Sequence, residues 1–166
     1  MKVESLVLTA ALLLSVSAAR LTAQTIPDIT VESIDGVKVS SKTLCQEDKP
    51  TVISFWATWC KPCIQELDAV SEVLEEWREE LEFNFAAVSI DDARAASKAR
   101  TFASGRGWDG IGFFFDVNGD FRRALNVNQI PHVLIYDSSG KQVYSHSGYV
   151  PGGEEEIFTR LKQISK

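Results

Sequence analysis

The sequence predicts an α/β fold in which a central mixed β-sheet is flanked by helices on both faces. Two observations lead to this prediction. Short apolar runs rich in β-branched and aromatic residues, typical of strands, alternate with segments whose apolar residues recur every three or four positions, as in amphipathic helices. The order of these segments is βαβα, followed by a hairpin and a last helix. The chain has 166 residues, of which 45% are hydrophobic, so it can form one domain with a substantial core.

Each element follows from its own pattern. Asp35-Gly36 is a hairpin-type turn between two short apolar segments. Asp91 and Asp92 are candidate N-caps for the helix that follows them, and Gly152-Gly153 precede the last helix. The expected strands are residues 29–32, 37–39, 51–57, 84–90, 112–116, 132–136 and 142–145. The expected helices are residues 61–80, 93–104, 121–127 and 154–164.

The first 23 residues differ from the rest of the chain. Lys2 precedes an uncharged apolar run over residues 6–16, and small residues follow it. This order is typical of a secretory signal, and the run is shorter than the roughly 20 residues that span a bilayer. We therefore expect residues 1–23 to be a signal peptide or N-terminal membrane-targeting segment and residues 24–166 to form the domain. An uncleaved anchor and an ordinary buried helix are the alternatives.

Trp59-Cys60-Lys61-Pro62-Cys63 lies where a predicted buried strand runs into a predicted helix. Two cysteines separated by two residues can close into a small disulfide ring, and the positive end of the helix favours a thiolate. A purely structural disulfide and half of a zinc site are the alternatives. Zinc needs about four ligands, and the remaining candidates, Cys45, His132 and His146, are not paired at ligand spacing. We expect a redox-active pair and no metal.

Charge and cysteine content narrow the function further. The net charge is −6, which is a poor electrostatic match for nucleic acid or an anionic membrane. We expect no nucleic-acid partner, and membrane contact only through residues 1–23 if they are not removed. Three cysteines are too few for a disulfide scaffold. The third, Cys45, is expected to be buried and inert rather than available for pairing with another molecule.

These motifs together resemble a known family. The segment from Phe55 to Cys63 is similar to the active-site segment of thioredoxin-fold proteins, and Ile130-Pro131 before a hairpin is similar to their cis-proline loop. The export-like N-terminus, Glu66 three residues after Cys63, and an additional segment over residues 91–127 point to the TlpA/ResA-like branch of exported thiol–disulfide oxidoreductases. The resemblance covers roughly residues 26–165. It implies a thioredoxin-like fold with an N-terminal β-hairpin and a central insertion.

The resemblance also assigns roles to residues. Cys60 would be the exposed nucleophile and Cys63 the resolving thiol, while Lys61 and Pro62 would tune the pair. Thioredoxins have a buried aspartate in the active-site strand where this chain has Ser54. Glu66, on the same helix face as Cys63, is the candidate for that carboxylate's proton-transfer role. A solvated helix glutamate is the alternative.

Substrate contacts are expected from residues on both sides of the pair. A cis bond before Pro131 would aim backbone groups of Ile130 at a bound substrate strand. Trp59 would be a partly exposed surface for the partner, whereas Trp56 would pack in the core. The side chain of His132 would point away from Pro131, because side chains alternate along a strand. No cofactor is expected.

The resemblance implies a periplasmic or otherwise extracytoplasmic enzyme, expected to be a monomer, that reduces disulfides in exported proteins. Cytochrome c maturation is one such role, and a membrane protein would supply the electrons. A peroxidase on the same fold requires a threonine three residues before its reactive cysteine, where this chain has Ala57. The alternative from another class is a metal chaperone or a non-catalytic binding module.

Overall fold

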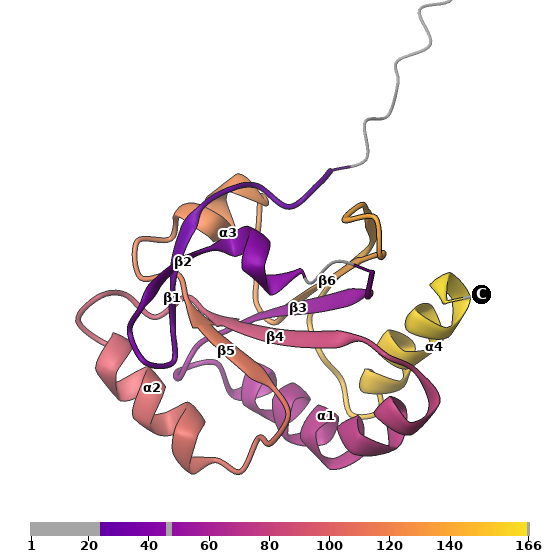
Figure 1. Cartoon of the computed structure of the whole chain (residues 1–166). Helices are drawn as coiled ribbons and strands as arrows, with labels where there is room; N and C mark the ends of the chain where they lie inside the picture. Colours follow the sequence, from indigo (N-terminus) through magenta and orange to yellow (C-terminus); the bar gives the residue numbers. More distant parts are fainter. Residues whose placement is uncertain (1–23, 46–47, 166) are drawn as a thin grey trace, which may run out of the picture.

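The computed structural model describes residues 24–45 and 48–165 (Figure 1). The expected targeting segment, residues 1–23, lies outside this range. The described residues form a seven-stranded sheet in the order β2-β1-β5-β4-β3-β6-β7. Strands β3, β4 and β5 are parallel to one another, and the other neighbouring pairs are antiparallel, so the predicted mixed sheet is confirmed. Within the described ranges, no helix has both the length and the apolar character to cross a membrane.

The elements follow the predicted order, and most bounds differ from the predicted ones by one to three residues. The strands are β1 Thr30–Ser33, β2 Lys38–Ser40, β3 Thr51–Trp56, β4 Asn84–Ser89, β5 Gly112–Phe115, β6 His132–Tyr136 and β7 Gln142–Ser147. The α-helices are α1 Lys61–Glu80, α2 Ala96–Gly105, α3 Asp120–Ala124 and α4 Glu154–Ile164, and η1 is a short 3-10 helix over Ser41–Leu44.

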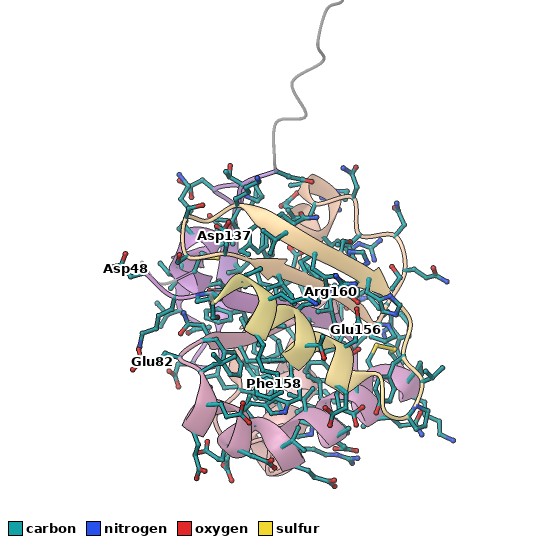
Figure 2. The ribbon with its side chains drawn as sticks, turned by 90° about the vertical axis from the view of Figure 1, so that its right-hand side faces the viewer. Asp48, Glu82, Asp137, Glu156, Phe158 and Arg160 are labelled. Carbon is teal, nitrogen blue, oxygen red and sulfur yellow. A yellow bond between two sulfur atoms is a disulfide. The ribbon has the colours of Figure 1, made fainter. Side chains whose placement is uncertain are left out.

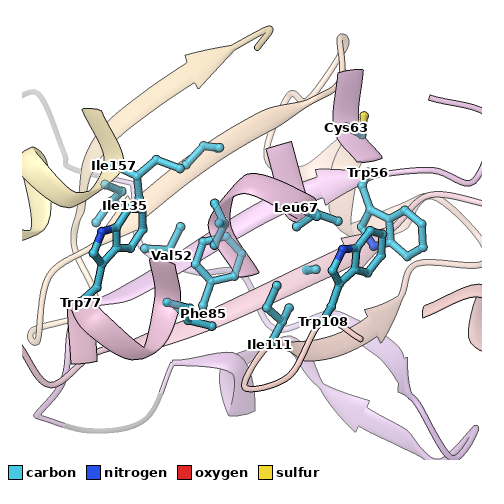
Figure 3. Packing of buried hydrophobic residues seen from close by; sticks show 14 of the residues in the cluster. Val52, Trp56, Cys63, Leu67, Trp77, Phe85, Trp108, Ile111, Ile135 and Ile157 are labelled. Atoms are coloured by element: carbon cyan, nitrogen blue, oxygen red, sulfur yellow. The ribbon is translucent and has the colours of Figure 1, made fainter. Parts of the chain in front are cut away.

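Helices cover both faces of the sheet and enclose two apolar clusters. Figure 1 shows α1, α2 and α4 below the sheet and α3 above it. Strand β3 is buried along its whole length, and its side chains alternate between the two faces. Val52 and Trp56 join the cluster under α1 (Figure 3), whereas Ile53 and Phe55 join the cluster with Phe121 of α3. The continuous apolar run in the sequence therefore reflects a central strand that is covered on both faces.

The last helix, α4, lies against the sheet and α1 (Figure 2). Phe158 stacks on Trp77 of α1 with ring centroids 4.9 Å apart and planes within 2° of parallel. On its outer side, the Arg160 Nε donates to Glu156 at 2.8 Å. Its first turn carries three glutamates and its last turn carries Lys162, which matches the helix dipole. This packing places the N-terminal turn of α4 near the edge of the sheet described below.

The N-terminal β-hairpin is confirmed, with Val31 opposite Val39 and Gly36 at a positive φ of 79° in its turn. The central insertion is more than a surface addition. Its strand β5 pairs in parallel with β4 and antiparallel with β1, so it lies inside the sheet between them. The insertion thereby joins the hairpin to the rest of the sheet.

The predicted start of the second helix was wrong. Helix α2 begins at Ala96, and its N-cap residue Ala95 makes no side-chain cap bond. Asp92 instead accepts backbone N–H bonds from Arg94 and Ala95 in a turn before the helix. Asp91 does not cap the helix, because its buried carboxylate is directed to other partners.

The strand order brings distant segments to one edge of the sheet. In the parallel pair β3 and β4, Trp56 lies opposite Ser89, so both strands end at this edge. Strand β6 runs the other way and places His132 opposite Phe55, so it starts at the same edge. The residues after Trp56, after Ser89 and before His132 therefore meet there.

Candidate active site

Cys60 and Cys63 are joined by a disulfide at the N-terminus of α1. Cys60 is the N-cap residue, and the backbone N–H of Cys63 donates to its Sγ at 3.3 Å. Pro62 is accommodated in the first turn, where a helix needs no N–H donor. A thiolate on Cys60 would face the same N–H and the positive end of the helix dipole, so this position favours the reactive form of the nucleophile.

Cys60 is less exposed than predicted. Its exposed fraction is 6%, against 1% for Cys63, because it packs in the apolar cluster that also holds Trp56. The prediction that Cys60 is exposed was therefore wrong for the disulfide form. Its neighbours Lys61 and Pro62 are exposed, as tuning residues at the surface would be.

Trp59 is the most exposed aromatic residue of the site, with 69% of its surface accessible. It forms one wall of an open groove of about 570 Å³ whose other walls include Ile90, Arg94 and Lys98. The groove begins at the residue before Cys60. A protein chain that presents a disulfide to Cys60 could rest against this indole.

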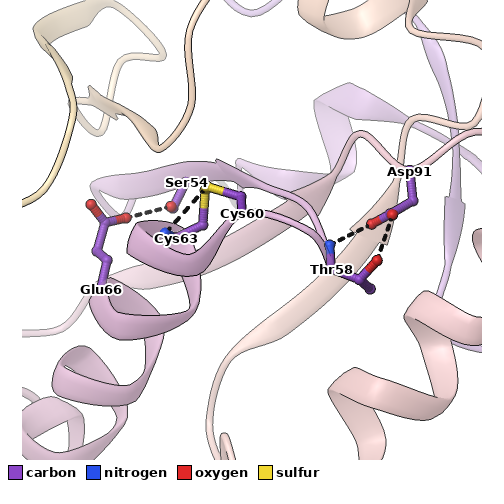
Figure 4. The surroundings of a disulfide bond; sticks show 6 residues. All are labelled: Ser54, Thr58, Cys60, Cys63, Glu66 and Asp91. Carbon is purple, nitrogen blue, oxygen red and sulfur yellow. Dashed lines mark hydrogen bonds between the residues drawn. A yellow bond between two sulfur atoms is a disulfide. The ribbon is translucent and has the colours of Figure 1, made fainter.

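Glu66 lies one helical turn after Cys63 and is only 2% exposed. Its Oε1 accepts a hydrogen bond from the Ser54 hydroxyl at 2.7 Å (Figure 4). Burial raises the pKa of Glu66 to about 7; the bond from Ser54 opposes this rise and the charge of Glu154 adds to it. Ser54, which stands where thioredoxins have an aspartate, thus donates a hydrogen bond that orients the carboxyl of Glu66. A carboxyl that titrates near neutrality can both accept and return a proton.

Asp91 is a residue of the site that we did not predict in this role. Its carboxylate accepts from the Thr58 backbone N–H at 2.9 Å, from the Thr58 hydroxyl at 2.8 Å, and from the Ser89 hydroxyl at 2.8 Å. Figure 4 shows the two bonds between Asp91 and Thr58, which lies in the loop before Cys60. Asp91 therefore fixes the loop before the disulfide to the end of β4. The sequence signal that could have indicated this role is the position of Asp91, a polar residue directly after a predicted buried strand.

The Ile130–Pro131 peptide bond is cis, as the resemblance implied. The carbonyl of Pro131 accepts from the Gly148 N–H at 2.8 Å, and the half-buried Ile130 packs against both apolar clusters. Since β6 is the antiparallel neighbour of β3, this loop lies at the sheet edge from which Cys60 follows. The structure brings together the segments of all the residues predicted for the site.

His132 points away from the cysteines. Its Nδ1 lies 2.6 Å from the Ser147 hydroxyl and its Nε2 lies 3.2 Å from the Ser145 hydroxyl, both on β7. Among the described residues, no three His, Cys, Asp or Glu side chains form a group that could hold a metal ion. Cys45 is half-buried rather than fully buried as predicted. Burial raises the pKa of its thiol, which favours the protonated, weakly nucleophilic form.

A reactive cysteine pair at a helix N-terminus, a buried carboxyl one turn away and a cis-proline loop beside them define a thioredoxin-like thiol–disulfide oxidoreductase. Comparison with known proteins agrees. The model of the AhpC/TSA family matches residues 22–145, and the chain belongs to this family. Several homologues of this chain are named thiol–disulfide oxidoreductases.

Individual relatives cover most of the chain. The thioredoxin-like protein YneN of Bacillus subtilis is 30% identical over 141 residues, which span 80% of this chain and 75% of that protein. The thiol–disulfide oxidoreductase ResA of Bacillus anthracis is 33% identical over 139 residues, which span 84% and 76%. The solution structure of a thioredoxin-like protein from Porphyromonas gingivalis is 42% identical and superimposes with a TM-score of 0.74 over 84% of this chain and 90% of that one.

Proposed function

We propose that this enzyme reduces disulfide bonds of exported proteins outside the cytoplasm. The observation that carries the proposal is the buried Glu66 one turn after Cys63, hydrogen-bonded to Ser54 and with a pKa near neutrality. A disulfide that only stabilises the fold needs no such proton carrier beside it. A dithiol that turns over does, because each thiol must lose its proton before its sulfur can attack.

The proposed cycle starts from the reduced pair. The Cys60 thiolate attacks one sulfur of the substrate disulfide, and the other sulfur leaves as a thiolate that takes up a proton. The Cys63 thiol then gives its proton to the carboxylate of Glu66 and attacks Cys60 Sγ, which releases the second substrate sulfur. The substrate gains two electrons, the Cys60–Cys63 disulfide forms, and the proton on Glu66 is available to the leaving thiolate.

The remaining residues support the same substrate class. Trp59 offers an apolar surface beside the nucleophile, and the backbone of Ile130, before the cis bond to Pro131, can pair with an extended segment of the substrate. These contacts suit a protein that presents a cysteine on an extended strand. The AhpC/TSA family match does not favour peroxide as the substrate, because Ala57 stands where the peroxidase signature has threonine.

Export is the second part of the proposal, and it is supported by the composition of residues 1–23. Extracytoplasmic compartments are oxidising, so another protein must reduce the Cys60–Cys63 disulfide again. We propose a membrane protein with its own dithiol as this donor, and apocytochrome c as one substrate. Fusing residues 1–23 to a reporter that is active only after export tests whether these residues direct export. A reporter that stays inactive would contradict the proposed export.

Insulin-disulfide reduction with dithiothreitol as the electron source tests the activity. Wild type should catalyse it, Cys60→Ser should abolish it, and Cys45→Ser should retain it, because Cys45 packs against the opposite face of the sheet. The proposal would be refuted if the wild-type cysteines can be reduced and reoxidised but the protein does not catalyse the reduction of insulin disulfides. If that inactive dithiol bound stoichiometric copper, the binding-module alternative would take its place.

A Cys63→Ser variant should identify the partners. Without the resolving thiol, Cys60 stays bonded to whatever it attacks, and the mixed disulfide can be isolated from cells under non-reducing conditions. We expect exported cysteine-containing proteins and a membrane protein among the trapped species. The same variant with Cys60→Ser added is the matched control and should trap none. Capture of cytoplasmic proteins alone would contradict the proposed location.

A further inference from the structure

Glu66 has a second side that faces away from the cysteines. Its Oε1 is occupied by Ser54, and Figure 4 shows the other carboxylate oxygen turned away from Ser54. On that side Glu66 lines a narrow cavity of about 40 Å³, shared with Val133, Tyr144, His146 and Tyr149. A space of this size has room for one or a few water molecules.

Strand pairing explains why this cavity exists. Ser54 of β3 lies opposite Val133 of β6, and Val133 lies opposite His146 of β7, so the three residues form a row across the sheet. The small Val133 leaves space between Glu66, which contacts the first member of the row, and β7. The turn from β7 into α4 forms one wall of the cavity, through Gly148, Tyr149, Val150 and Gly153.

Within this wall, Tyr149 is held in place by the carboxylate of Glu154. The Tyr149 hydroxyl donates to Glu154 at 2.7 Å, and both side chains are half-buried. Burial first, and then Glu154, raise the pKa of Tyr149 to about 12, so its hydroxyl remains a donor at neutral pH. A Cβ at Gly153 would lie 2.9 Å from the Val150 carbonyl, so the turn is tight and holds the pair in place.

The two carboxyl groups have opposite surroundings. Glu66 is enclosed in apolar packing, which favours its protonated form. Glu154 lies in the first turn of α4, where the helix dipole favours a negative charge. We propose that Glu154, which accepts a hydrogen bond from Tyr149 in the wall of this cavity, is a positioning residue for the redox reaction, and that its negative charge helps Glu66 to retain the proton that Glu66 exchanges with the dithiol. The effect of Glu154 on Glu66 does not depend on the proposed function; only the exchange of the proton between Glu66 and the dithiol rests on it.

Other titratable groups also face Glu66 and must be separated from this effect. They are Cys63 on α1, Tyr144 and His146 on β7, and Tyr149 in the turn. The guanidinium carbon of Arg160 lies 5.1 Å from the ring centroid of Tyr144. In the oxidised protein Cys63 does not titrate, so the disulfide form isolates the carboxyl groups from the thiols.

The test is a pH titration of the oxidised protein, in which the carboxyl carbons of labelled glutamates are followed by NMR. The signal of Glu66 is identified as the one that disappears in Glu66→Gln. Glu154→Gln should move the midpoint of Glu66 to lower pH. Tyr149→Phe, which frees Glu154, should move it in the same direction by a smaller amount. Glu155→Gln removes the same charge from the neighbouring exposed position and should leave the midpoint unchanged.

Equal midpoints in wild type and Glu154→Gln, or equal shifts in Glu154→Gln and Glu155→Gln, would overturn the inference. This measurement uses no substrate, so its outcome is independent of the proposed reductase activity. In a second measurement, the acid limb of the pH profile for insulin reduction should move to lower pH in Glu154→Gln. A midpoint that moves while the pH profile does not would show that Glu154 acts on Glu66 but not on the reaction, which also overturns the proposed role.

Discussion

Replacing Glu66 by glutamine should stabilise this protein increasingly as the pH rises above about 4.5, with the full effect reached above about pH 7. The side chain keeps its shape and can still accept the bond from Ser54, but it can no longer carry a buried charge. The folded-state pKa of Glu66 is about 7, above the ordinary 4.5. The folded protein therefore binds this proton more tightly than the unfolded chain does, so its contribution to stability falls as pH rises from 4.5 to about 7.

The size of the effect follows from that interval. At about 1.4 kcal/mol for each pH unit, the penalty reaches about 3 kcal/mol above pH 7. Glu66→Gln removes the penalty, so its advantage over wild type in unfolding free energy should grow by up to about 3 kcal/mol between pH 4.5 and pH 8. Because only 2% of Glu66 is exposed, solvent screening reduces this value little.

Urea unfolding of the oxidised proteins at several pH values measures this difference without the screening that a salt denaturant would add. Glu155→Gln, which alters an exposed carboxylate, is the control and should show no such pH dependence. If the advantage of Glu66→Gln were the same at pH 4.5 and pH 8, Glu66 would not hold a raised pKa and our account of its proton would be refuted. Disulfide exchange by the variant should fall on the order of 100-fold, the lower end of general acid–base effects.

Two further predictions concern the loop before Cys60. Asp91→Ala should lower the free energy of unfolding by about 3 kcal/mol in urea titrations, because it leaves the donors of Thr58 and Ser89 without a charged acceptor. The control Asp92→Ala removes a carboxylate from an exposed ion pair and should lower the free energy of unfolding by less than about 1 kcal/mol. Equal losses in the two variants would contradict this account. Trp59→Ala should change stability by less than about 0.5 kcal/mol but lower kcat/KM for insulin while leaving a small disulfide unaffected. Equal loss on both substrates would show that Trp59 acts on the cysteines and not on the protein partner.

Much of the fold was predictable because its signals are local. Helices α1 and α4 have the predicted bounds, since apolar residues at helical spacing and charges matching the dipole lie within each segment. The boundary of α2 was not predictable in this way. Two consecutive aspartates offer the same capping chemistry, and only the pairing of β3 with β4 decides that Asp91 faces Thr58.

The exposure of the cysteines also depends on the whole fold. Spacing and context predict that Cys60 and Cys63 form a pair, because two intervening residues allow a ring at a helix start. How far Cys60 is covered depends on side chains such as Trp56 that pack beneath it. Spacing carries no information about that packing. Similarly, the half-buried state of Cys45 follows from η1 and the sheet beneath it.

The sequence by itself determined the kind of chemistry, through the Cys60–Cys63 pair at a strand–helix junction, and the candidate proton carrier, through the position of Glu66 one helical turn later. Only the tertiary structure decided which groups control that proton. Ser54, Tyr149 and Glu154 come from a strand, a loop and a helix far apart in the chain. The fold bonds Ser54 to Glu66, places Tyr149 in the same cavity as Glu66, and bonds Glu154 to Tyr149. A carboxyl's pKa depends on its solvation and on nearby charges, and both are properties of the packed molecule rather than of neighbouring residues in the sequence.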